Sequence, residues 1–309
     1  RDEMIKVAIN GFGRIGRLVF RLMDNDPNFE IVAINDLTDA EQLAYLLKYD
    51  TNHRNYRIDD IDFVDNKIVV GGKEITVYAE KDPAMLPWAE LGVDVVFECT
   101  GLFTSEEKAM AHINAGAKKV IISAPAKGNI KTIVYNVNHE TLTGDERIIS
   151  AASCTTNCLA PVVDVLDRVF GINKGFMTTV HAYTNDQASL DIAHKKGIKA
   201  RRGRACAANI IPASTGAASA IGLVCPNLAG KLDGTAMRVP VPTGSVVDLT
   251  LELKTNTTAE EINAALRAAT NETLEYTEDP IVSSDVIGRR CGSLVDGLST
   301  NVLEVDGKQ

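Results

Sequence analysis

The sequence has few aromatic residues, few cysteines and no long apolar run. Aromatic residues make up 5% of the 309 residues, with one tryptophan. The longest uncharged segment, 205–230, is broken by polar residues and prolines, so no membrane span is predicted. The six cysteines do not form the dense framework of a small secreted protein. The first residues, Arg1 to Met4, are charged and lack the apolar core of a signal peptide. We therefore expect free thiols and a cytoplasmic location.

Positive charge is also in deficit, since 32 Lys and Arg face 41 Asp and Glu, for a net charge of −9. Nucleic acid is therefore not expected as the primary ligand, because non-specific binding depends on neutralising phosphates. The apolar share of 45% and charged share of 24% are those of an ordinary globular chain. A length of 309 residues is typical of two domains.

The first half alternates short apolar runs with helical patterns, which predicts a doubly wound parallel sheet. Gly71-Gly72 separates two β-branched runs and indicates a hairpin. The acidic stretch 59–65 is expected to be solvated surface. The other apolar runs predict strands near 5–9, 31–34, 93–97 and 120–122. The helical patterns predict helices near 15–23, 40–48 and 105–115.

The second half begins with a helix near Ser153 and continues with longer alternating strands. These strands, near 177–181, 235–241 and 246–253, are expected to be antiparallel with one exposed face. A late amphipathic helix is expected at 259–269, and a long loop between Tyr183 and Asn209. We place the domain boundary near 148–153, which gives domains 1–152 and 153–309.

A glycine motif, G-x-G-x-x-G, joins the first expected strand to the first helix. Gly11 permits a tight turn, Gly13 lets the backbone approach a pyrophosphate, and Gly16 allows close helix–strand packing. Asp36 lies twenty residues past Gly16, at the end of the next strand. A carboxylate at this position accepts hydrogen bonds from the hydroxyls of the adenosine ribose and repels a 2′-phosphate. The alternative is a plain glycine turn with a helix-capping Asp.

Cys154 begins the helix at the domain junction, within the segment Ser153-Cys154-Thr155-Thr156-Asn157-Cys158. The free N–H groups and positive dipole of a helix start lower a thiol pKa, so Cys154 is a candidate nucleophile. Two alternatives remain open: a pair of buried structural thiols, or a metal site, although no second pair of ligands is evident.

His181 ends an expected strand and is the candidate base, since an imidazole beside a thiol activates it. The remaining four histidines are expected to be structural: His53, His112, His139 and His194.

Cations that could bind an anion gather in the second half. Six lie in the loop segment 195–204, where a solvated face with subunit salt bridges is the alternative for most of them. Arg238 lies inside an apolar strand, which is costly unless the guanidinium has an anionic partner. Ser214-Thr215-Gly216, expected at a helix start, is a further candidate anion site.

Five segments together resemble the phosphorylating glyceraldehyde-3-phosphate dehydrogenase family across essentially the whole chain. The resemblance is carried by residues 9–17, 153–161, 181–184, 209–218 and 232–240. It implies an α/β fold, with an N-terminal doubly wound Rossmann domain and an α+β catalytic domain whose sheet is mostly antiparallel. It also implies NAD as cofactor, no metal, and a homotetramer.

The resemblance implies roles residue by residue. Cys154 would attack the aldehyde, and His181 would activate the thiol, assist hydride departure and stabilise the oxyanion beside the Cys154 N–H. The cofactor would be held by Gly11, Gly13, Arg14, Ile15, Gly16, Asp36, Lys81, Thr100, Gly101 and Ser123. The substrate phosphate would be bound by Thr184 and Arg238, and inorganic phosphate by Ser153, Thr155, Thr215 and Gly216. Arg202 is grouped with these phosphate residues as a weaker assignment, from the long loop that packs near a neighbouring subunit's cofactor.

The implied reaction oxidises glyceraldehyde 3-phosphate and adds inorganic phosphate, giving 1,3-bisphosphoglycerate through a cysteine thioester in glycolysis. An erythrose-4-phosphate dehydrogenase with the same Cys and His is the first alternative. A non-catalytic surface or RNA-binding role is the second.

Two features depart from the family pattern. The family continues past the strand corresponding to 301–305 with a further strand and a C-terminal helix, which carries an asparagine that orients the nicotinamide carboxamide. The given chain ends at Gln309 without that helix, so we expect a truncated or incomplete sequence. Ala193 stands where NAD-specific members often have proline, which weakens the case for strict NAD preference, whereas Asp36 supports it.

Overall fold

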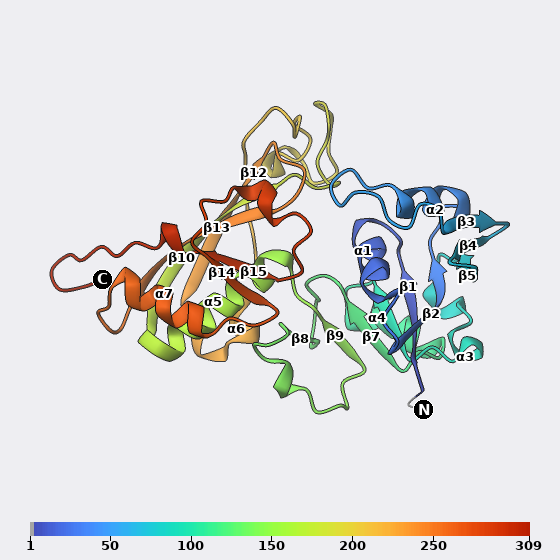
Figure 1. Cartoon of the computed structure of the whole chain (residues 1–309), viewed down its shortest axis with the longest axis horizontal. Coiled ribbons are helices and arrows are strands. Elements are labelled where there is room, and N and C mark those ends of the chain that lie inside the picture. The colour runs from blue at the N-terminus through green and yellow to red at the C-terminus, as the bar shows by residue number, and fades with distance from the viewer. Residues whose placement is uncertain (1–2) are drawn as a thin grey trace. The chain divides into compact units, whose positions relative to one another are not determined.

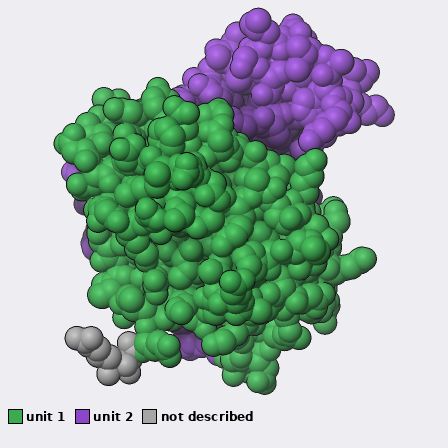
Figure 2. Space-filling view, turned by 90° about the vertical axis from the view of Figure 1, so that its right-hand side faces the viewer, with its two compact units in different colours: residues 1–133, 141–152 green, residues 134–140, 153–309 purple. Residues whose placement is uncertain are grey.

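The computed structural model describes residues 3–309 (Figure 1). Arg1 and Asp2, which belong to the charged N-terminal stretch, lie outside the described residues. The chain forms two compact units, coloured separately in Figure 2. Unit 1 contains residues 1–133 and 141–152, and unit 2 contains residues 134–140 and 153–309. The segment 134–140 therefore packs with unit 2, although it lies well before the boundary expected from the sequence.

Unit 1 is built on a nine-stranded sheet of order β3-β4-β5-β2-β1-β6-β7-β9-β8. The pairings from β5 through to β8 are parallel, and β3 and β4 extend this edge with antiparallel pairings. The strands are β1 (Ile5–Asn10), β2 (Phe29–Asn35), β3 (Ile61–Val64), β4 (Lys67–Val70), β5 (Lys73–Tyr78), β6 (Val95–Glu98), β7 (Lys119–Ile122), β8 (Lys131–Thr132) and β9 (Ile148–Ser150).

Helices cover both faces of this sheet, because β1 is apolar on both sides. Val7 packs with Phe20 of α1 and Leu47 of α2 in one buried cluster. Ala8, which points to the opposite face, packs with Ile113 of α4 in a second cluster. The expected doubly wound fold is confirmed. The helices of unit 1 are α1 (Arg14–Met23), α2 (Ala40–Lys48), α3 (Trp88–Leu91), α4 (Glu106–Asn114) and the 3-10 turn η1 (Pro83–Met85).

The acidic stretch 59–65 is only partly the solvated surface that its charge suggests. Residues 61–64 form β3, which pairs antiparallel with β4. Ile61 is 2% exposed, whereas the other three residues of the strand are exposed. Ile61 joins the buried cluster that contains Ile68 of β4, so this edge strand is held by one apolar side chain as well as by its pairing with β4.

Unit 2 has a four-stranded sheet of order β11-β12-β10-β13, with a separate parallel pair, β14 and β15. The strands are β10 (Ile172–Ala182), β11 (Ile211–Ala213), β12 (Leu232–Val239), β13 (Ser245–Leu253), β14 (Leu274–Thr277) and β15 (Ser293–Asp296). The helices are α5 (Cys154–Phe170), α6 (Ile221–Val224), α7 (Ala259–Ala268), η3 (Ile198–Ala200), η4 (Pro226–Leu228), η5 (Ser283–Val286) and η6 (Gly297–Ser299); η2 (His139–Thr141) crosses from unit 2 to unit 1.

Two expectations for unit 2 are wrong in part. The sheet is mostly antiparallel, but β10 pairs with β12 in parallel. The chain between these strands is a long crossover rather than a hairpin, and only a crossover permits parallel pairing. Ser214-Thr215-Gly216 does not begin a helix, because a turn at 217–220 follows it and α6 starts at Ile221.

Gly16 provides a test of how closely α1 approaches β1. A Cβ at Gly16 would lie 2.0 Å from the carbonyl oxygen of Gly11, whereas a Cβ at Gly13 would meet nothing within 4 Å. We predict that Gly16→Ala lowers the free energy of unfolding by about 1–3 kcal/mol, as overpacking does. Gly13→Ala is the matched control and should cost less, below about 1 kcal/mol, because Ala meets no atom there and is only a poorer N-cap than Gly. Denaturant unfolding measures both, and equal stability of the two variants would contradict the close approach.

Candidate functional site

The glycine loop between β1 and α1 is shaped to take an anionic group. Gly11 has φ +90°, a conformation that side chains rarely adopt, and its Cβ position would lie 2.9 Å from the Thr100 nitrogen. Gly13 is the N-cap of α1 and has no side chain to bond the first-turn N–H groups. These free N–H groups can bind a pyrophosphate, and the open space at Gly13 lets the pyrophosphate come close to the backbone.

Asp36 lies at the end of β2 and holds the glycine loop directly. Its Oδ2 accepts the Phe12 N–H at 2.7 Å, and its Oδ1 accepts the Thr38 N–H at 2.9 Å. Each carboxylate oxygen has a second lone pair, so Asp36 fits the hydroxyls of a ribose as well.

The other expected cofactor residues of unit 1 lie at the carboxyl ends of strands or in the loops that follow. Thr100 and Gly101 follow β6, and Ser123 follows β7, donating its hydroxyl to the Glu98 carbonyl at 3.1 Å. Lys81 is exposed after β5. At the start of α1, the Arg14 side chain is paired with Asp50, and Ile15 is half exposed. The residues of this edge thus fit a dinucleotide across the ends of the parallel strands.

Cys154 is the first residue of α5 in unit 2 and is exposed. The preceding Ser153 caps the helix, since its hydroxyl accepts the Thr156 N–H at 3.0 Å. His181, at the end of β10, places its Nε2 3.3 Å from the Cys154 sulfur. A cavity of about 380 Å³ opens beside Cys154, lined also by Tyr135 and Arg290. The structure thus brings the expected nucleophile and base together at an accessible position.

The pKa of the Cys154 thiol is lowered from its ordinary value, in contrast to most other cysteines. Desolvation of the sulfur acts to raise this pKa, but the hydrogen bond and charge of His181, with two bonds from Thr155, outweigh it. Burial instead raises the pKa of Cys99 to about 11 and that of Cys225 to about 12. Burial also raises the pKa of Cys158 and Cys291.

Arg238 is the register partner of His181 in the parallel pairing of β12 with β10. Its Nη1 lies 2.9 Å from His181 Nδ1 and donates to the Ala182 carbonyl at 2.8 Å and the Thr184 hydroxyl at 3.3 Å. The paired register therefore puts a guanidinium, an imidazole and a hydroxyl at one end of the sheet.

Two guanidinium groups in this region keep buried N–H groups without a hydrogen-bond partner among the described residues. They are Arg238 Nε and Arg202 Nη1. Arg202 Nη1 lies 3.4 Å from Asp186 Oδ2, close enough for charge attraction but outside hydrogen-bonding geometry. Burial, followed by the charge of Arg202, lowers the pKa of Arg238. Two cations that repel each other and retain donors fit a multivalent anion such as phosphate.

The second expected anion site lies around the start of α5. The Thr156 hydroxyl donates to the Ala217 carbonyl at 3.4 Å, which joins this helix start to the loop of Thr215 and Gly216. The Thr215 hydroxyl accepts the Ala217 N–H at 3.2 Å. Thr155 is buried beside Cys154. The structure thus links the expected phosphate residues of the two segments in one region of unit 2.

Sequence reasoning missed two acidic residues. Asp186 accepts the Thr184 hydroxyl at 2.5 Å and faces Arg202; only its place in the loop after His181 could have indicated it. Glu98 is 1% exposed at the end of β6 and bonds Thr100. A glutamate that ends an apolar β-branched run is the signal that could have found Glu98.

Over residues 3–309, no three His, Cys, Asp or Glu side chains are arranged to hold a metal ion. The same residues contain no helix with the length and apolar character needed to cross a bilayer.

A dinucleotide-binding sheet, joined in one chain to a paired thiol and imidazole, defines a class: the nicotinamide-dependent dehydrogenases that act through a cysteine. Residues 5–106 match the family description "Glyceraldehyde 3-phosphate dehydrogenase, NAD binding domain", and residues 153–308 match the C-terminal domain of the same family. The chain belongs to the glyceraldehyde 3-phosphate dehydrogenase family.

Curated relatives agree with the family match. The chain is 61% identical over 306 residues to a glyceraldehyde-3-phosphate dehydrogenase of Clostridium pasteurianum, covering 99% of this chain and 91% of the relative. Proteins of the same name from Clostridium acetobutylicum and Streptococcus pyogenes serotype M1 are 59% and 55% identical, each over 99% of this chain and 91% of the relative.

The lowered thiol pKa predicts selective alkylation. Iodoacetamide should modify Cys154 well before Cys158 or Cys291, because only its thiolate is populated at lower pH. The pH of half-maximal alkylation rate should rise in His181→Asn, since the variant loses the bond that stabilises the thiolate. Mass spectrometry of peptides after timed quenching measures both rates. Faster labelling of Cys291 than of Cys154 would overturn the assignment.

Proposed function

We propose that this protein catalyses the NAD-dependent oxidation and phosphorylation of glyceraldehyde 3-phosphate to 1,3-bisphosphoglycerate in glycolysis. The observation that carries the proposal is the 3.3 Å contact between the Cys154 sulfur and His181 Nε2 at the start of α5, with Arg238 against the other ring nitrogen. The family membership and the names of the relatives support the choice of substrate.

Cys154 and His181 would perform the covalent chemistry. With its Nδ1–H donated to the Ala182 carbonyl at 2.8 Å, His181 has Nε2 free to take the thiol proton. The thiolate then adds to the aldehyde carbon, and the imidazolium returns its proton to the oxygen to give a hemithioacetal. His181 then takes the hydroxyl proton as the carbon loses a hydride, which leaves a thioester on Cys154. When bound, NAD supplies the hydride acceptor. Inorganic phosphate attacks the thioester, and release of the thiolate gives the acyl phosphate.

The cofactor would be held by unit 1. The pyrophosphate would lie on the backbone of Gly11, Gly13, Arg14, Ile15 and Gly16. The adenosine half would contact Asp36 and Lys81, and the nicotinamide half would contact Thr100, Gly101 and Ser123. Asp36 would repel the 2′-phosphate of NADP, which supports a preference for NAD.

Two phosphate sites would lie in unit 2. Thr184 and Arg238, with Arg202 nearby, would bind the phosphate of the substrate. Arg238 Nε and Arg202 Nη1, which have no hydrogen-bond partner among residues 3–309, support this assignment. Ser153, Thr155, Thr215 and Gly216 would bind inorganic phosphate beside Cys154.

We further propose domain roles of dinucleotide binding for residues 1–152 and catalysis for residues 153–309. We also propose a homotetramer, with nucleic acid not the primary ligand. The half-exposed Phe176 of β10 and Val246 of β13 support burial of that sheet face between subunits. The six free cysteines support a cytoplasmic location.

A single assay tests the proposed activity. Absorbance of NADH should rise when the protein, NAD and glyceraldehyde 3-phosphate are combined with phosphate, and this rise should require Cys154. Turnover of erythrose 4-phosphate, measured in the same buffer, distinguishes this activity from that of an erythrose-4-phosphate dehydrogenase. Preferential oxidation of erythrose 4-phosphate, or NADH formation retained in Cys154→Ala, would refute the proposal.

Arg238 allows a prediction about substrate choice. Arg238→Ala should cost about 2–4 kcal/mol in kcat/KM for glyceraldehyde 3-phosphate, on the scale of losing a buried charged contact. The loss of kcat/KM should be smaller for unphosphorylated glyceraldehyde. This substrate has no phosphate for Arg238 to bind, so the substitution affects it only through the contact of Arg238 with His181. Arg238→Lys should restore part of the activity, because lysine keeps the charge without the planar fork.

The matched control is Arg204→Ala, an exposed arginine paired with Asp191 in the same unit. Its kcat/KM should stay near wild type for both aldehydes. Equal losses for both aldehydes in Arg238→Ala would show that Arg238 acts only through His181.

A further inference from the structure

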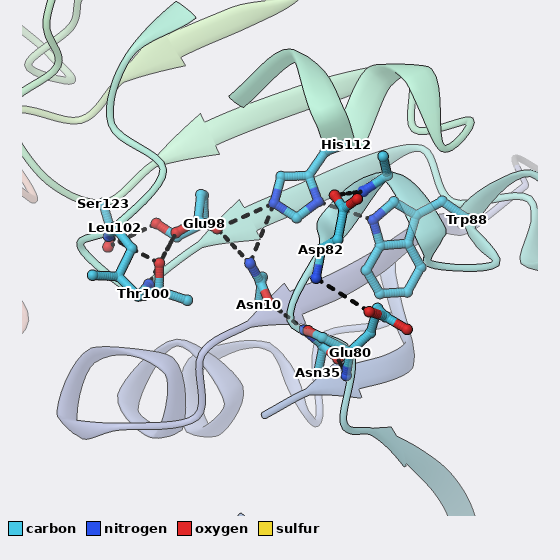
Figure 3. Close-up of polar contacts among 11 residues, drawn as sticks. Asn10, Asn35, Glu80, Asp82, Trp88, Glu98, Thr100, Leu102, His112 and Ser123 are labelled. Carbon is cyan, nitrogen blue, oxygen red and sulfur yellow. Dashed lines mark hydrogen bonds and ion pairs between the residues drawn. The ribbon is translucent and has the colours of Figure 1, made fainter. Parts of the chain in front are cut away.

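A chain of buried polar side chains runs beneath the carboxyl ends of β1, β2 and β6, and the proposed chemistry does not use it (Figure 3). Glu98 is 1% exposed and His112 is 0% exposed. Asn10, Asn35 and Trp88 complete the chain and are also buried. A buried carboxylate is costly, so the structure must compensate Glu98 by hydrogen bonds.

The proton positions follow from one end of the chain, at Trp88. The indole nitrogen of Trp88 lies 3.0 Å from His112 Nδ1. An indole N–H only donates, so Nδ1 of His112 must accept. His112 is therefore a neutral ring with its proton on Nε2, which it donates to Glu98 Oε1 at 3.1 Å. The contact of His112 with Glu98 is a hydrogen bond rather than an ion pair.

At the other end of this hydrogen-bonded series, at Asn35, the donors are also directed toward Glu98. Asn35 is oriented by the backbone of Glu80, because its Oδ1 accepts the Glu80 N–H and its Nδ2 donates to the Glu80 carbonyl, both at 2.9 Å. The Nδ2 of Asn35 also donates to Asn10 Oδ1 at 2.8 Å. Asn10 must then present its own Nδ2 to Glu98 Oε1, at 2.5 Å. Asn10 Nδ2 also lies 3.3 Å from His112 Nε2, but in this arrangement both atoms are donors that share Glu98 Oε1 rather than partners of each other.

The second oxygen of Glu98 holds the loop that follows β6. Oε2 accepts the Thr100 N–H at 3.0 Å and the Thr100 hydroxyl at 2.7 Å. The Thr100 hydroxyl in turn accepts the Leu102 N–H at 3.0 Å. Glu98 is thus an ionised carboxylate with four donors directed at it, and no member of the chain can reverse its direction.

We propose that Glu98 is a positioning residue that shapes the Thr100–Leu102 loop for the nicotinamide half of the dinucleotide. The inference rests on the proposed function, which places Thr100, Gly101 and Ser123 at that half. Glu98 bonds Thr100 through its side chain and Ser123 through its carbonyl. Its role is therefore to set the loop rather than to react.

The adenosine half has supports that do not include Glu98. Asp36 is bonded to the Phe12 N–H and the Thr38 N–H. Asn35 is bonded twice to the backbone of Glu80, beside Lys81. Loss of the Glu98 carboxylate should therefore disturb the nicotinamide side and leave the adenosine side in place.

This difference gives a test with ligands that share the adenosine half. In Glu98→Gln an amide N–H₂ faces N–H or O–H donors on either side, so at least one contact becomes repulsive. We expect the Kd of NAD to rise about tenfold or more, the equivalent of about 1.4 kcal/mol, while the Kd of ADP, which lacks the nicotinamide and its ribose, changes less than about threefold. Isothermal titration of the full chain measures both constants. Glu107→Gln, an exposed glutamate of α4, is the matched control and should change neither.

A second pair of variants decides the matter if Glu98→Gln does not fold. Thr100→Val removes the hydroxyl that links Glu98 to Leu102, whereas Thr100→Ser retains it. Thr100→Val should weaken NAD selectively over ADP, and Thr100→Ser should bind both like wild type. Equal weakening of both ligands, in Glu98→Gln or in Thr100→Val, would overturn the inference. Failure of the wild-type protein to bind NAD at all would instead overturn the proposed function.

Discussion

The burial of the Glu98 carboxylate is the constraint on which the nicotinamide side of the nucleotide-binding unit depends. An ionised carboxylate away from water is tolerated only when donors surround it, and here four of them converge. Trp88 at one end can only donate, and Asn35 at the other end is oriented by backbone. The end of β6 is therefore held against the ends of β1 and β2, and the loop that follows β6 takes its position from this network.

Backbone packing adds a second restraint at the same edge of the sheet. Gly11 packs against Thr100, and Gly16 packs against the carbonyl of Gly11, so a methyl group at either glycine has no room. Gly13, between them, faces open space. The loop is thus rigid where it touches the protein and open where a ligand would lie, an arrangement that lowers the entropy lost on binding.

Signals confined to a few neighbouring residues allowed correct predictions from the sequence. The glycine motif, α2 and the start of α5 depend on turns, caps and apolar spacing within one element, and all three are present. The contact of His181 with Arg238 depends instead on the parallel register of β10 with β12, strands far apart in the chain. No local pattern encodes that register, and antiparallel pairing was the wrong expectation for these two strands.

The hydrogen-bond networks of the two units differ in how completely they are satisfied, and the difference has a physical consequence. Around Glu98 every donor direction is determined and every carboxylate oxygen is used, so the network stabilises one conformation. Around Arg238 and Arg202, buried N–H groups have no hydrogen-bond partner within the described part of the chain, and the two cations repel each other. A folded chain retains such a cost where an incoming group relieves it. Complete satisfaction is therefore what a scaffold requires, and incomplete satisfaction at Arg238 and Arg202 supports the anion site proposed there.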